Sequence, residues 1–230
     1  AGFNAISYDC QSYSEDAGWQ TGTGFRAVVV ASADAGLSNP VALIFAGGEY
    51  AGRLFVINQG DNSVVSFKLG EGATERSFLT GAPAPSLLTT IVWDERNTFD
   101  RLLYVGDQGT DGDQDSKIYR LLPSGELQLF VAAPGAGLDD IYGLAFTPAS
   151  WPTQGLLVTG DTDSPSAAQW GLVSDAGVVT AFSNLPGVEG LAVDDSASDG
   201  AYVLASRPNG GGYSGDDTVT RVYSDGGSGG

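Results

Sequence analysis

The sequence predicts an all-β protein, a β-propeller of about four four-stranded blades that an N-terminal strand closes. Short apolar runs recur in groups of four along the 230 residues, and none of them shows helical periodicity. Most turns between the runs contain Gly, of which the chain has 34. Gly suits tight turns because it reaches positive φ without a steric penalty.

Each unit opens with two strands whose residues are mostly apolar, which is typical of strands buried on both faces. The first strands are predicted at 41–45, 90–93, 143–146 and 190–193. The second strands are predicted at 53–57, 102–105, 156–159 and 201–204. A polar residue follows each second strand, and the four are Asn58, Asp107, Asp161 and Ser206, at intervals of 49, 54 and 45 residues. Four short strands per unit of this length indicate a propeller blade.

The outer two strands of each unit alternate apolar and polar residues and are joined by a tight turn. The third strands are predicted at 64–69, 118–122, 170–174 and 219–223. Fourth strands are predicted at 76–79, 127–131 and 178–182, and the last unit lacks one. The segment 25–31, which contains Val28-Val29-Val30, has the composition of the missing strand. We expect it to pair beside 219–223, because closing the ring removes exposed sheet edges.

The segments IYGLAFTPASWPTQGLLVTGD (141–161), RLLYVGDQG (101–109) and KIYRLLPSGELQLFVAAPG (117–135) resemble the blades of bacterial NHL and gluconolactonase-like propellers. The resemblance covers roughly residues 37–225 and implies a blade fold without specifying an activity. Propellers of these families usually have six blades, whereas this sequence shows four repeats. The ring is therefore unusually small, or other chains or further sequence complete it.

The repeat leaves out both ends of the chain, so we divide it into an arm at 1–24, a propeller at 25–225 and a flexible Gly/Ser tail at 226–230. The arm is expected to pack over the propeller or to dock on a neighbouring subunit, which would give self-association. Cys10, the one Cys, is a free thiol or the source of an intermolecular disulfide. The sequence contains no Met, even at position 1. Signal-peptide cleavage before Ala1 would explain this and predicts a secreted or cell-surface protein.

The net charge of −18 argues against binding to nucleic acid or anionic membranes, both of which require basic surface. No window of 18 consecutive apolar residues predicts a membrane span. The complete absence of His excludes Ser-His-Asp and Cys-His catalysis and His-ligated metals. Lyase-type propellers that these blades resemble use a His base, so that activity is not expected here.

One acidic loop, residues 107–115, is the candidate metal site. Its carboxylates at Asp107, Asp111, Asp113 and Asp115 would repel one another unless a cation or water screens them. Ca²⁺ takes six to eight oxygen ligands, which such a loop can supply. The alternative is a solvated surface loop, and no Glu closes the loop as in a helix-loop-helix site.

A second candidate site follows from the resemblance to gluconolactonase-like enzymes. Their ion is held by a Glu, an Asn and an Asp at one face of the ring, which Glu189 and Asn58 could match. The alternative for Glu189 is that it only begins the first strand of its blade. The resemblance thus implies a metal-dependent lactonase, while the lack of catalytic residues favours a non-enzymatic extracellular scaffold or binding protein. A glycosidase with two convergent carboxylates is a third hypothesis.

Overall fold

The structure is a computed structural model, and it describes residues 13–14, 18–19, 36–68, 77–78, 85–110, 115–132, 140–160, 170–182, 188–193, 202–206, 218–222 and 228–229. The chain divides into two compact units, Ala1–Leu37 and Ser38–Gly230. The first unit contains two short antiparallel strands, β1 (Tyr13–Ser14) and β2 (Gly18–Trp19).

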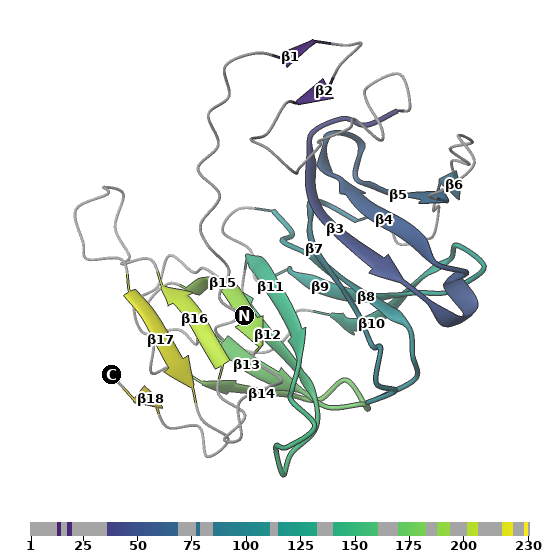
Figure 1. Cartoon of the computed structure of the whole chain (residues 1–230). Coiled ribbons are helices and arrows are strands. Elements are labelled where there is room, and N and C mark those ends of the chain that lie inside the picture. The colour runs from purple at the N-terminus through teal and green to yellow at the C-terminus, as the bar shows by residue number, and fades with distance from the viewer. Residues whose placement is uncertain are drawn as a thin grey trace. The chain divides into compact units, whose positions relative to one another are not determined.

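The second unit contains four antiparallel sheets, each of four strands in chain order (Figure 1). The first sheet consists of β3 (Pro40–Ala46), β4 (Arg53–Asn58), β5 (Ser63–Lys68) and β6 (Ser77–Phe78). The second consists of β7 (Leu88–Trp93), β8 (Leu103–Asp107), β9 (Lys117–Leu121) and β10 (Leu127–Ala132). The third consists of β11 (Ile141–Phe146), β12 (Leu156–Gly160), β13 (Trp170–Val173) and β14 (Val179–Phe182). The fourth consists of β15 (Val188–Val193), β16 (Tyr202–Ser206), β17 (Thr218–Val222) and β18 (Ser228–Gly229).

The prediction of an all-β protein is confirmed. The described residues include no α-helix, and their helical turns are the short 3₁₀ segments η2 (Gly48–Tyr50) and η3 (Gln59–Asp61). Within the same residues, no helix has the length and apolarity needed to cross a membrane.

The first strand of every sheet begins one or two residues earlier than predicted, because its register shifts near its start. The shift leaves one extra residue between two paired ones, which makes a β-bulge. The extra residues are Val41, Thr89, Tyr142 and Glu189.

Successive sheets contact one another mainly through their first strands, β3 with β7, β7 with β11, and β11 with β15. Apolar clusters fill these junctions, and the larger ones include Tyr119 between the first and second sheets and Tyr104 between the second and third. Gly106 permits a close approach, because a Cβ there would lie 2.7 Å from Thr90 Cγ2 and 2.9 Å from Ile141 Cγ2. Trp151 and Trp170 are buried, as expected for core aromatics.

The fourth sheet has an outer strand of its own. β18 pairs with Arg221 and Val222 of β17, beside the strand where 25–31 was expected to pair. Residues 25–31 lie outside the described residues, so closure by an N-terminal strand is not confirmed and stays a prediction. Among the described strands, no pairing joins the first sheet to the fourth.

Candidate functional site

Asp107, the first residue of the predicted calcium loop, ends β8 and is fully buried. Its carboxylate accepts hydrogen bonds from the backbone N–H groups of Ser86, Leu87 and Gly109, at 2.7–3.2 Å. Ser86 and Leu87 belong to the segment that enters β7. The side chain therefore fastens the incoming chain to the sheet, and its oxygens point toward backbone donors.

Asn58 occupies the same position in the first sheet, and it likewise binds the segment that enters its sheet. It is fully buried, and its Oδ1 accepts a hydrogen bond of 2.5 Å from the N–H of Ser38, just before β3. Its Nδ2 donates to Asp61 Oδ1 at 2.7 Å. The regular interval of polar residues in the sequence thus marks a repeated fastening of the chain that enters each of these two sheets.

The rest of the acidic loop is described only in part. Asp111 and Asp113 lie outside the described residues. Asp115 accepts a hydrogen bond of 2.8 Å from the N–H of Thr110 and one of 3.0 Å from its hydroxyl. These bonds, together with nearby Lys117, hold the pKa of Asp115 below its usual range, and the Thr110 N–H has the largest effect.

In the described part of the chain, no group of three or more His, Cys, Asp or Glu side chains could hold a metal. Of the four predicted ligands, Asp107 and Asp115 are described, and both already accept hydrogen bonds from the protein. The charge of Asp115 at neutral pH fits a cation site, whereas the burial of Asp107 under three backbone donors does not. The calcium prediction therefore depends on Asp111 and Asp113.

Glu189, which the sequence analysis proposed together with Asn58 for the second metal site, lies on β15 at the bulge between Val188 and Gly190. Bulges occur often beside active sites because they re-aim a side chain. The same bulge position in the second sheet has a structural function, since the Thr89 hydroxyl donates to the carbonyl of Ile141 on β11. The apolar pattern of the sequence did not predict these bulges.

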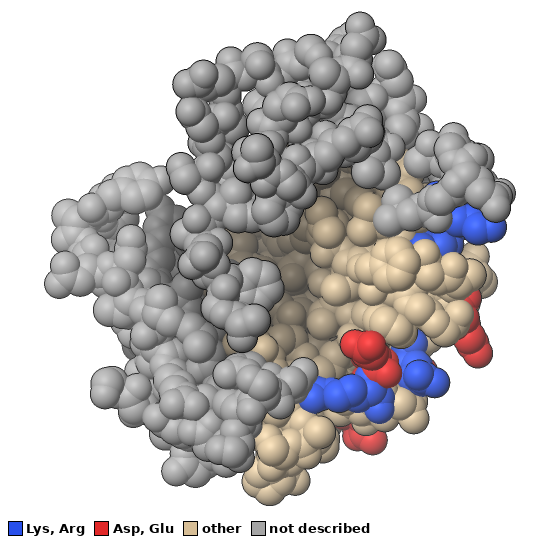
Figure 2. Space-filling view, viewed as in Figure 1, with Lys and Arg blue, Asp and Glu red and all other residues tan. Residues whose placement is uncertain are grey.

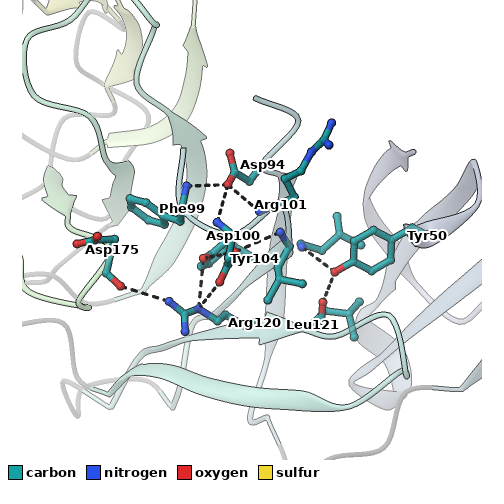
Figure 3. Close-up of polar contacts among 11 residues, drawn as sticks. Tyr50, Asp94, Phe99, Asp100, Arg101, Tyr104, Arg120, Leu121 and Asp175 are labelled. Carbon is teal, nitrogen blue, oxygen red and sulfur yellow. Dashed lines mark hydrogen bonds and ion pairs between the residues drawn. The ribbon is translucent and has the colours of Figure 1, made fainter. Parts of the chain in front are cut away.

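A polar network that the sequence analysis also missed lies where the second and third sheets meet (Figure 3). Arg120 pairs with Asp100 at 3.2 Å, and its guanidinium carbon lies 4.2 Å from the ring centroid of Phe130. Asp100 also accepts a hydrogen bond of 2.9 Å from the hydroxyl of Tyr104. Burial raises the pKa of Tyr104, and the bond to Asp100 adds to this effect. The phenol therefore stays protonated and serves as a donor.

The loop that carries Asp100 is folded around Asp94, which is buried directly after β7. The Asp94 carboxylate accepts four backbone N–H groups, those of Thr98, Phe99, Asp100 and Arg101, at 2.7–3.1 Å. A polar residue directly after the first strand is the sequence signal for this turn. Thr147 stands in the corresponding position after β11, where its hydroxyl accepts the N–H of Gly155 at 3.0 Å. The hydrogen bonds of this network therefore lie within the protein and stabilise the turns that follow β7 and β11.

On the face seen in Figure 2, the described residues within the hollow are uncharged, and the Lys, Arg, Asp and Glu side chains visible in this view lie away from it. The exposed large apolar side chains include a row on alternate residues of β3, which we call the β3 strip: Val41, Leu43 and Phe45. They are 45%, 67% and 51% exposed. Apolar surface grouped in this way is a feature of interaction sites.

The β3 strip is exposed although the same positions are covered in the next sheets. Leu43 pairs with the second strand as Ile91 and Leu144 do, and those two are each only 7% exposed. Ile91 packs in the cluster with the first sheet, and Leu144 packs in the cluster with the second. These positions therefore face the preceding sheet. In the described part of the chain, no four-stranded sheet precedes the first one.

No protein-family model and no curated protein matches the chain. Solved structures do match. A virginiamycin B lyase from Staphylococcus aureus is 14% identical with a TM-score of 0.56, over 82% of this chain and 54% of that one. A chain of a nidogen/laminin complex is 14% identical with a TM-score of 0.58, over 82% and 62%. A gluconolactonase from Xanthomonas campestris is 20% identical with a TM-score of 0.52, over 77% and 57%.

These likenesses establish the fold at the level of NHL and gluconolactonase-like β-propellers, as the sequence resemblance implied. The chain spans between about half and three-fifths of the length of these three structures. They include two enzymes and a complex between proteins, so the fold leaves the activity open.

Proposed function

We propose that this chain is a non-enzymatic, secreted β-propeller that acts as an extracellular scaffold or binding protein, as a subunit of a surface assembly. One observation carries the proposal. The described polar side chains at the ends of the second strands, Asn58 and Asp107, are buried and bonded to the chain that enters their sheets. A group committed to internal hydrogen bonds is not free to hold a substrate or move a proton.

The proposal includes four blades, and it leaves ring closure to the segment 25–31 or to another chain. It also includes stabilisation by Ca²⁺ at the loop of Asp107, Asp111, Asp113 and Asp115. An ion that binds only the folded state at about 100 times its dissociation constant adds roughly 2.7 kcal/mol. Thermal melts with excess Ca²⁺ and with chelator measure this effect. The melting temperature should rise with Ca²⁺ in the parent and not in a variant with both Asp111→Ala and Asp113→Ala.

A metal-dependent lactonase is the second candidate, and the bulge that contains Glu189 on the first strand of its sheet favours it. Its test is the hydrolysis of aldonolactones with Ca²⁺, Mn²⁺ or Zn²⁺, by the parent and by Glu189→Gln. A scaffold gives the spontaneous rate in both. Hydrolysis that needs the metal and disappears in Glu189→Gln would establish the lactonase and refute the scaffold. The conservative change to Gln keeps the size of the side chain, so a loss of activity reports the carboxylate.

A further inference from the structure

The β3 strip lies at positions that, in the second and third sheets, form one half of the junction with the preceding sheet. In the second and third sheets the same half is completed by the preceding sheet, which covers Ile91 and Leu144. The second and third strands of the first sheet, β4 and β5, are already buried on this face, as Val56, Val65 and Phe67 show. What stays uncovered is β3, and first strands make most of the contact between successive sheets.

The other half of such an interface is uncovered at the far end of the repeat. Ile44 and Val92 lie on the opposite side of their strands from the strip positions, and both pack in the junction with the following sheet. Ala192 stands in their position on β15, since Leu191 pairs with Leu204 as Leu43 pairs with Val56. Ala192 is exposed.

We propose that the β3 strip binds β15 of a second copy of this chain, head to tail. The contact would continue the series of junctions already present between β3 and β7, β7 and β11, and β11 and β15. One chain carries both halves, so each copy can bind one neighbour at each end. The inference rests on the proposed function as a subunit of an assembly.

The order of the described sheets supports this occupant. No pairing among the described strands joins the first sheet to the fourth, so the two uncovered halves stand at the two ends of one series. Two copies of four sheets each supply eight, which lies within the range of about four to eight blades found in propellers. A head-to-tail contact closes into a ring when the rotation permits and otherwise continues as a filament.

The net charge of the chain predicts how the association depends on salt concentration. Every copy carries a net charge of −18, so copies repel one another, whereas the strip itself is apolar. Salt screens repulsion between exposed charges and leaves apolar contact intact. Association through the strip should therefore strengthen as the salt concentration rises.

The test is sedimentation velocity of the full chain over a range of protein and salt concentrations. The parent should form dimers or longer species that increase with both. Leu43→Asp should weaken association about tenfold or more, because it places a charge in an apolar contact. Val178→Asp is the matched control. It adds the same charge at a residue 64% exposed, next to 67% for Leu43, and should associate like the parent.

A mixture of two variants tests the direction of the contact and distinguishes a lost contact from a misfolded protein. Ala192→Asp damages the other half and, on its own, should weaken association as Leu43→Asp does. Mixed with Leu43→Asp, it should give a one-to-one dimer, because each variant keeps one intact half. A parent that is monomeric at all concentrations, or a mixture that fails to dimerise, overturns the proposal. Neither result tests the scaffold function, which the lactone assay tests, so the proposed association and the proposed function can fail separately.

Discussion

The first strands of the first and third sheets have the same register and different surroundings. Leu43 and Leu144 are the same residue type, and each pairs with a Val of its second strand. Leu43 is 67% exposed, and Leu144 is 7% exposed. The apolar pattern alone therefore specifies a strand that is able to pack on both faces. Whether it does so depends on the neighbouring unit, which the strand's own sequence does not encode.

The largest difference that this comparison predicts is between the truncation of Leu144 and the truncation of Leu43. Leu144→Ala should lower the free energy of unfolding by about 2–5 kcal/mol, because it opens a cavity between two sheets. Leu43→Ala should change it by less than about 0.5 kcal/mol, as is usual for exposed sites. Urea unfolding at low protein concentration, where any assembly has dissociated, measures both. Equal losses would show that the β3 strip is covered within the single chain.

The strands were predictable because apolar runs and Gly turns recur with little variation along the chain. All four first strands and all four second strands were located within two residues of their observed bounds. The bulges, such as the one at Glu189, were not predictable, because a strand with apolar residues on both faces shows no alternation whose phase a shift of one residue would change. The outer strand β18 was missed because Gly and Ser have low strand propensity.

The role of Asp107 shows why the candidate site was harder to predict than the fold. A carboxylate that follows a strand can bind a cation or cap backbone N–H groups, and both patterns contain Asp beside Gly. The donors that decide between them are Ser86 and Leu87, about twenty residues earlier in the chain. Such long-range partners depend on the register between sheet and linker, which local spacing does not reveal.

The second prediction concerns the hydrogen bonds by which Asp107 holds the chain that enters the second sheet. Asp107→Ala should lower the free energy of unfolding by about 2–3 kcal/mol, because it leaves the part-buried N–H groups of Ser86 and Leu87 and the buried N–H of Gly109 without their acceptor. Hydrogen exchange at these two amides should also become faster. Asp115→Ala is the control, since it removes only the bonds from Thr110, and we expect it to cost less than about 1 kcal/mol. If Asp115→Ala costs as much as Asp107→Ala, the bonds of the acidic loop stabilise the sheet as much as those of Asp107 do, and the prediction is wrong.

The smallest effect is predicted on the covered side of the first sheet, opposite the β3 strip. Tyr50 reaches across to the second sheet, where its hydroxyl donates to the carbonyl of Leu121 and accepts the N–H of Leu103 at 3.0 Å (Figure 3). Tyr50→Phe should lower the free energy of unfolding by about 1–2 kcal/mol at neutral pH, because both backbone groups lose their partner. Urea unfolding measures the loss, which should be smaller than that of Leu144→Ala.

The same residue gives the junction a dependence on alkaline pH. Burial raises the pKa of Tyr50 to about 12, and the charges of Asp100 and Glu49 add to the effect of burial. An unfolded Tyr ionises near about pH 10, so the folded state holds this proton more tightly than the unfolded state does. The resulting stability is complete below about pH 10 and is lost as the pH rises through about 12. Tyr104 and Tyr119 also have raised pKa values and remain in both proteins. Tyr50→Phe should therefore make the loss of stability above pH 10 shallower without abolishing it, and an unchanged slope would show that the Tyr50 hydroxyl does not form this bridge in solution.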